Sequence, residues 1–129
     1  MSLPIFLAED DPSIRQHLTD AMNAVCDAEV VAWADCEKAS IAWMKAHHDE
    51  WKLAVLDLFL KQGTGFGILR SLTDAEAREK VIVLTNSATA ENRALCLRLG
   101  ARAVYDKTSQ LDEFLDHCLR HHRQDRTGA

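Results

Sequence analysis

The most constraining feature of this sequence is an apolar run that recurs along the chain and stops abruptly at a polar residue. Four segments share this pattern: PIFLAEDD (4–11), LAVLD (53–57), VIVLT (81–85) and ARAVYDK (101–107). A fifth run, EVVAWAD (29–35), is also apolar but ends with fewer reactive groups. Continuous apolar runs of this length are typical of strands that are covered on both faces, as in a parallel sheet. The sequence therefore predicts five buried strands.

Segments with helical spacing lie between and after these strands. Apolar residues recur every three or four positions within 14–25 and within 111–119, which is the spacing of one helix face. Asp11 can cap a helix that begins at Pro12, and Gly100 is placed to end another helix in the left-handed conformation. Alternating strands and helices with right-handed crossovers form a doubly wound α/β sheet. We therefore expect a five-stranded parallel sheet with five helices, although periodicity leaves the strand order open.

Composition and charge are those of a single globular domain. The 129 residues are 47% hydrophobic and 27% charged, and the four cysteines lack CxxC spacing, so one core with free thiols is expected. The formal net charge of -5 argues against direct nucleic-acid binding, which needs clustered Lys and Arg. No apolar run approaches the roughly 20 residues that span a membrane, and no basic segment precedes the first run. We expect no membrane partner and a cytoplasmic location.

Parallel strands bring the residues that follow them to one edge of the sheet. This edge would receive five chemically active residues: Glu9, Asp10, Asp57, Thr85 and Lys107. Three carboxylates so close together repel one another, and a divalent cation relieves the repulsion. Oxygen ligands without nearby His or Cys favour a hard ion, and few carboxylates with room for water favour magnesium. The sequence therefore predicts a Mg²⁺ site at this edge.

Asp57 is the expected nucleophile of the site. A carboxylate beside Mg²⁺ can attack phosphorus, because the metal and an ammonium neutralise the charge on the transferred phosphoryl oxygens. Lys107 could pair with the bound phosphoryl group, and the Thr85 hydroxyl could donate to one of its oxygens. The glycine-rich segment after Asp57, LFLKQGTGFG (58–67), permits a tight turn beside the pocket. This combination favours phosphoryl transfer to Asp57.

In this order and spacing, the motifs resemble the receiver domains of bacterial two-component response regulators, of the single-domain, chemotaxis-regulator type. AEDDPSIR (8–15) is similar to the metal-binding acids of that family, and LAVLDLFL (53–60) is similar to its phosphoacceptor strand. VIVLTNSA (81–88) and VYDK (104–107) resemble the segments with the switch hydroxyl and the lysine. The resemblance covers nearly the whole chain.

The resemblance implies a flavodoxin-like strand order of 2-1-3-4-5. It implies a receiver domain over residues 1–124, followed by a short C-terminal tail over residues 125–129. It also implies that Asp10 and Asp57 bind Mg²⁺ directly, that Glu9 helps, often through water, and that the backbone carbonyl of Phe59 is a further ligand.

The same resemblance implies a function. Asp57 would accept a phosphoryl group from a sensor histidine kinase or a phosphotransfer protein, and the modified chain would bind an output protein differently. Its own phosphotransfer and autodephosphorylation would be its only reactions, so the chain is not expected to be an enzyme in the usual sense. Because no effector domain is recognisable, we expect a stand-alone regulator that acts through a separate protein, or a phosphate sink or relay.

Three positions depart from the usual pattern of the family, and one of them is Lys61, which replaces a frequent Pro after the acceptor. Val104 stands three residues before Lys107, where a switch aromatic is common, and Tyr105 would lie on the opposite face of a regular strand. Thr108 follows the lysine in place of a common Pro, so the isomer of this peptide bond stays open. One alternative is therefore a receiver-fold binding module that acts without phosphorylation. An aspartate-nucleophile phosphatase of the haloacid dehalogenase type is less favoured, because it needs an acid where Phe59 stands.

Overall fold

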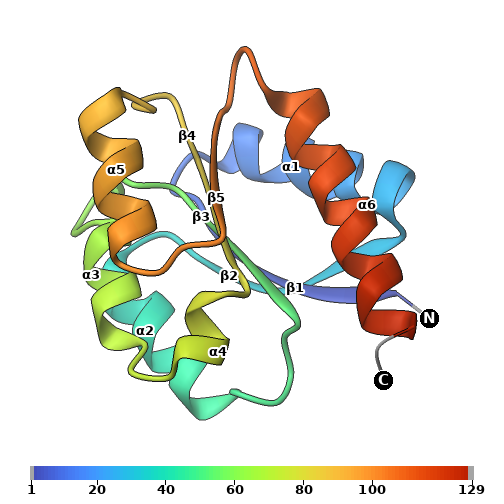
Figure 1. Cartoon of the computed structure of the whole chain (residues 1–129), viewed down its shortest axis with the longest axis horizontal. Helices are drawn as coiled ribbons and strands as arrows, with labels where there is room; N and C mark the ends of the chain where they lie inside the picture. The colour runs from blue at the N-terminus through green and yellow to red at the C-terminus, as the bar shows by residue number, and fades with distance from the viewer. Residues whose placement is uncertain (1, 128–129) are drawn as a thin grey trace.

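The computed structural model describes residues 2–127, and the side chains of residues 2–124. A five-stranded sheet lies between two layers of helices (Figure 1). The strands are β1 (Leu3–Ala8), β2 (Ala28–Ala34), β3 (Leu53–Leu56), β4 (Val81–Thr85) and β5 (Ala103–Asp106). The helices are α1 (Pro12–Cys26), α2 (Glu37–Ala46), α3 (Gly65–Ser71), α4 (Ala75–Arg78), α5 (Ala90–Arg98) and α6 (Leu111–Thr127).

All neighbouring strands run parallel, and their order across the sheet is β2-β1-β3-β4-β5. The expected flavodoxin-like, doubly wound order is therefore confirmed. Every residue of β3 and β4 is buried, because helices cover both faces of the sheet at its centre. This double cover explains why the runs in the sequence are continuously apolar rather than alternating. The sequence predicts five buried strands, but the edge strand β2 leaves Val31 and Trp33 exposed, because an edge strand has less helix cover.

The two helix layers enclose two separate apolar cores. Helices α1 and α6 cover one face of the sheet, and α2, α3, α4 and α5 lie on the other side (Figure 1). Along β1, Ile5 and Leu7 belong to the core under α1 and α6, whereas Phe6 and Ala8 belong to the other core. This alternation follows from the period of two along a strand.

Most helix boundaries follow local signals. The side chain of Asp11 caps α1, whose first residue is Pro12, and Gly100, just past α5, has a φ of 103°, as the sequence predicts. Six helices are present within the described residues where we expected five. The additional one is α4, a single turn capped by Asp74 through the backbone N–H of Glu76. A four-residue helix is too short to show a helical period in the sequence.

The longest helix, α6, has 17 residues and ends at Thr127. It therefore includes the first part of the segment 125–129, which we expected to be a tail, and residues 128 and 129 lie outside the described residues. The domain boundary after residue 124 stays a prediction. Neither α6 nor any other helix within residues 2–127 has the length and apolar character needed to cross a membrane.

Candidate functional site

The carboxyl ends of four strands meet at one edge of the sheet, and each carries the polar residue that the sequence predicts. Glu9, Asp57 and Lys107 directly follow β1, β3 and β5, and Thr85 is the last residue of β4. Oxygen atoms of the Glu9, Asp10 and Asp57 carboxylates lie within 4.8 Å of one another. The fold therefore gathers the predicted acids, hydroxyl and amine at this carboxyl-end edge.

The ammonium of Lys107 joins two of the carboxylates. Its Nζ donates to Asp57 Oδ2 at 2.8 Å and also to Glu9 Oε1. The exposed fraction of the side chain is 10% for Lys107, 2% for Glu9 and 11% for Asp57. A buried carboxylate needs such a partner, because water no longer solvates its charge. The buried cation thus holds the predicted nucleophile in place.

Burial and ion pairing act in opposite directions on the pKa values at this edge. Burial raises the pKa of Glu9, and the hydrogen bonds from Lys107 and from the backbone N–H of Asp11 offset only part of the rise. Burial alone would lower the pKa of Lys107, but its hydrogen bonds to Asp57 and Glu9 outweigh burial and raise it. Lys107 therefore keeps its proton. A single ammonium does not compensate three clustered carboxylates, so the edge favours a further cation.

The oxygen atoms at this edge fit Mg²⁺. Among the described side chains, Glu9, Asp10 and Asp57 form the only group of three acids, histidines or cysteines close enough to share one ion, and carboxylates are hard ligands. Within residues 2–127, no hydrogen bond ends on the carbonyl of Phe59, although this residue pairs with Thr64 across its loop. That carbonyl oxygen remains free to bind a metal. Its role as a ligand stays a prediction.

The glycine-rich loop after β3 lies directly against the backbone of Asp57. The N–H of Gly65 donates to the carbonyl of Leu58 at 2.8 Å, and a Cβ on Gly65 would lie only 2.5 Å from the Asp57 carbonyl oxygen. Glycine is therefore required for this close approach. The side chain of Glu37 accepts from the N–H of Thr64 at 2.9 Å and fixes the same loop to α2.

Thr85 connects the loop after β4 to the loop after β5. Its hydroxyl accepts from the N–H of Ser87 at 3.1 Å, and its carbonyl accepts from the N–H of Lys107 at 3.1 Å. The hydroxyl of Thr108 donates to Asn86 Oδ1 at 3.1 Å, and the peptide bond between Lys107 and Thr108 is trans, as are all others in the described residues. These contacts join the loop after β4 to the loop after β5 at the carboxyl-end edge.

Val104 and Tyr105 face opposite sides of the sheet, as strand alternation predicts. Val104 lies in the core under α2, α3 and α5, whereas Tyr105 packs against the other core. The hydroxyl of Tyr105 lies 2.6 Å from Nδ1 of His117 on α6. Burial lowers the pKa of His117 and raises that of Tyr105, so both side chains are neutral near pH 7. The aromatic ring of β5 therefore lies on the face opposite Val104.

Two long cationic side chains lie beside the site, and the sequence predicted the contacts of neither one. Arg15 donates through Nη1 to the carbonyl of Glu9 at 2.8 Å, and its guanidinium lies 3.5 Å from the ring centre of Trp33. Lys61 forms an ion pair with Asp35 at 2.6 Å. The Lys61 contact joins the loops after β2 and β3, which are far apart in sequence. No local pattern could have indicated it.

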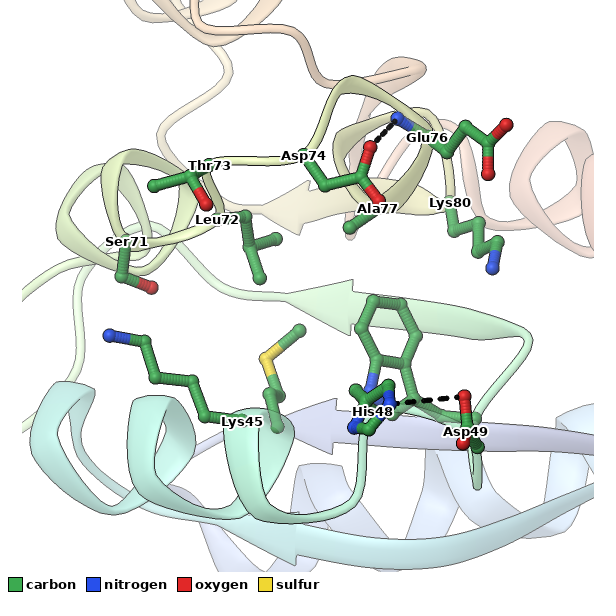
Figure 2. Close-up of a pocket in the computed structure, with 12 residues that line it drawn as sticks. Lys45, His48, Asp49, Ser71, Leu72, Thr73, Asp74, Glu76, Ala77 and Lys80 are labelled. Carbon is green, nitrogen blue, oxygen red and sulfur yellow. Dashed lines mark hydrogen bonds and ion pairs between the residues drawn. The ribbon is translucent and has the colours of Figure 1, made fainter.

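A cavity of about 430 Å³ lies at the opposite, amino-terminal edge of the sheet, between the ends of α2 and α3 and the short α4. Figure 2 shows charged side chains around it, including Lys45 and Lys80, with a contact between His48 and Asp49. It contains none of the predicted site residues. The ion pair between His48 and Asp49 at this edge is exposed to solvent, unlike the contacts of Lys107 at the carboxyl-end edge.

Comparison with known proteins identifies relatives of this chain. The family model described as the response regulator receiver domain matches residues 5–118. No functionally curated protein matches the sequence.

Solved structures of similar fold include the signal receiver domain of NarL from Mycobacterium tuberculosis, with a TM-score of 0.80 and 20% identity over 95% of this chain and 97% of that chain. The BeF3-activated receiver domain of RstA from Klebsiella pneumoniae has a TM-score of 0.79 and 23% identity over 94% and 99% of the two chains. A CheX-CheY-BeF3-Mg complex from Borrelia burgdorferi has a TM-score of 0.81 and 15% identity over 92% and 87%. These likenesses agree with the observed fold.

Proposed function

We propose that this chain, which belongs to the family of response regulator receiver domains, accepts a phosphoryl group on Asp57 and thereby changes its binding to an output protein. The donor would be a sensor histidine kinase or a phosphotransfer protein. The observation that carries the proposal is the buried contact of Asp57 Oδ2 with the Lys107 ammonium at 2.8 Å, beside two further carboxylates. A nucleophile, a cation and a set of metal ligands meet there in one small volume.

The acids at this edge would hold the metal ion. Glu9, Asp10 and Asp57 supply carboxylate oxygens, and the carbonyl of Phe59 is the proposed fourth ligand. When bound, Mg²⁺ would neutralise charge on the phosphoryl oxygens during transfer. A mixed set of carboxylate and carbonyl oxygens, with room for water, suits this ion.

Three side chains at this edge would have different roles in phosphoryl transfer. A carboxylate oxygen of Asp57 attacks the phosphorus, the bond from phosphorus to the imidazole nitrogen of the donor breaks, and the imidazole leaves. The ammonium of Lys107, already held at Asp57, pairs with a phosphoryl oxygen. The hydroxyl of Thr85, at the end of the neighbouring strand, donates to another. The product is an aspartyl phosphate that is lost again by hydrolysis.

Loading the chain with a small phosphodonor tests this proposal. Acetyl phosphate with Mg²⁺ should add one phosphoryl group to the wild-type chain and none to Asp57→Asn, as measured by intact-protein mass spectrometry. Asp49→Asn, at the opposite edge, is the matched control and should be modified like the wild type. Equal modification of Asp57→Asn would disprove the acceptor assignment.

Modification of the wild type distinguishes a receiver that is phosphorylated from a receiver-fold binding module that acts without phosphorylation. A wild-type chain that binds Mg²⁺ but takes up no phosphoryl group would favour a binding module that acts without phosphorylation. Stand-alone action, a cytoplasmic location and the lack of direct nucleic-acid binding stay predictions of the sequence.

A further inference from the structure

The cavity at the amino-end edge of the sheet combines apolar walls with a few polar groups. Met44, Trp51, Leu72 and Ala77 contribute the apolar part of its lining, and its volume is about 430 Å³. Pockets that hold small molecules are mostly apolar and have volumes of roughly 300 to 1,000 Å³. We call this hollow the amino-end cavity. Its size and lining suit a small organic molecule.

The indole of Trp51, which lines the amino-end cavity, has a hydrogen-bond donor without an acceptor. The residue is only 4% exposed, and its Nε1 has no hydrogen-bond partner among the described residues. Among the described side chains, only His122 shares this condition. An unpaired buried donor costs free energy, because it has lost its hydrogen bonds to water and gained none in the protein. A ligand with an acceptor oxygen would recover that free energy.

Two lysines place positive charge around the amino-end cavity. Figure 2 shows Lys45 and Lys80 on opposite sides of it. Neither ammonium forms an ion pair with a side chain of residues 2–124. The Nζ of Lys80 lies 5.9 Å from the centre of the Trp51 ring. One carboxylate can therefore lie between this cation and the indole.

The acids around the amino-end cavity are engaged elsewhere or point away from it. Asp49 Oδ1 pairs with His48 Nε2 at 3.3 Å, and Asp74 Oδ1 accepts from the backbone N–H of Glu76 at 3.0 Å. The carboxylate of Glu76 points away from the cavity in Figure 2. The unpaired charges that remain for a ligand inside the cavity are those of the two lysines. The cavity is therefore complementary to an anion.

We propose that the amino-end cavity binds a small organic acid with an apolar body. One carboxylate oxygen accepts from the Nε1–H of Trp51, and the carboxylate pairs with the ammonium of Lys80. The apolar body packs on Met44 and Leu72, which are buried side chains of the lining. The side chain of His48, also part of the lining, is 75% exposed and can turn aside to admit the ligand.

NMR titration of the full chain with phenylacetate tests this proposal. The indole N–H signal of Trp51 should move downfield and saturate at phenylacetate concentrations up to about 10 mM, because the proton gains an acceptor. Phenylacetamide has the same shape without the charge, and it should bind about tenfold more weakly, which is the effect of losing a hydrogen bond between charged groups. Acetate should also bind more weakly than phenylacetate, because it lacks the apolar ring.

Variants of the lining identify the groups that hold the acid. Lys80→Gln should bind phenylacetate about tenfold more weakly than the wild type, because the ammonium is lost. Lys38→Gln is the matched control, because Lys38 is an exposed lysine of α2 that does not line the cavity. Its affinity should equal that of the wild type. Trp51→Phe keeps an aromatic ring without the N–H and should also bind more weakly.

Each outcome supports or overturns the proposal. A Trp51 N–H signal that does not move and saturate would overturn it, and so would equal affinity for phenylacetate and phenylacetamide. Equal affinities of Lys80→Gln and Lys38→Gln would overturn it too. If Trp51→Phe does not fold, the wild-type signal and the lysine variants still decide. The cavity shares no residue with the acids at the carboxyl-end edge, so these results are independent of whether Asp57 is phosphorylated.

Discussion

Charged side chains are largely buried at the carboxyl-end edge of the sheet and exposed at the amino-end edge. At the carboxyl-end edge, Glu9 and Asp57 are buried, and both contact the ammonium of Lys107, whose side chain is 10% exposed. At the amino-end edge, charged side chains such as Lys45 and Asp49 are exposed around an open cavity (Figure 2). Buried charges interact strongly because the surrounding protein screens them little, whereas water screens exposed ones. The contrast teaches that buried contact between charges distinguishes the proposed phosphorylation edge from the other edge of the sheet.

The largest expected effect comes from removing the buried cation. Lys107→Ala leaves two buried carboxylates without their partner, so it should lower the free energy of unfolding by about 3 kcal/mol without divalent metal. Lys45→Ala, at the amino-end edge, should change it by less than about 0.5 kcal/mol. Urea unfolding of both variants measures the difference. Equal losses of unfolding free energy in the two variants would show that Lys107 and Lys45 stabilise the fold to the same extent.

Stabilisation by Mg²⁺ should depend on the acids of the carboxyl-end edge and not on those of the amino-end edge. Magnesium at roughly 100 times its dissociation constant should raise the free energy of unfolding by about 2.7 kcal/mol, because it binds only the folded site. Asp10→Asn should lose most of this gain, whereas Asp74→Asn should keep it. Thermal unfolding with increasing MgCl₂ measures both. If the two variants respond alike, the acids of the carboxyl-end edge do not hold the ion.

The smallest expected effect concerns α3, which runs from one edge to the other. Gly65→Ala pushes a Cβ against the Asp57 carbonyl and should destabilise the fold by about 2 kcal/mol. Ser71→Ala, at the far end of the same helix, removes one hydrogen bond to the carbonyl of Ile68 and should cost about 1 kcal/mol or less. Chemical unfolding compares the two. A Gly65→Ala chain as stable as the wild type would show that the loop can relax.

Local sequence patterns predicted the strands, but neither the order of the strands nor every helix. The strands and their polar ends follow from the sequence, because the apolar runs of the central strands β1, β3 and β4 reflect burial on both faces. Strand order came only from resemblance, since periodicity says nothing about which strands are neighbours. The helix α4 was missed because one turn is too short to show a period.

The sequence by itself determined which residues could carry the chemistry. Glu9, Asp57 and Lys107 each follow an apolar run, and parallel strands must bring such residues to one edge. Only the tertiary structure decided how these groups pair. The ammonium of Lys107 reaches Glu9 across 98 positions of sequence, and Arg93 joins three segments that no periodicity links. Such contacts depend on the packing of distant segments, whereas apolar runs and helix caps are recorded in neighbouring residues.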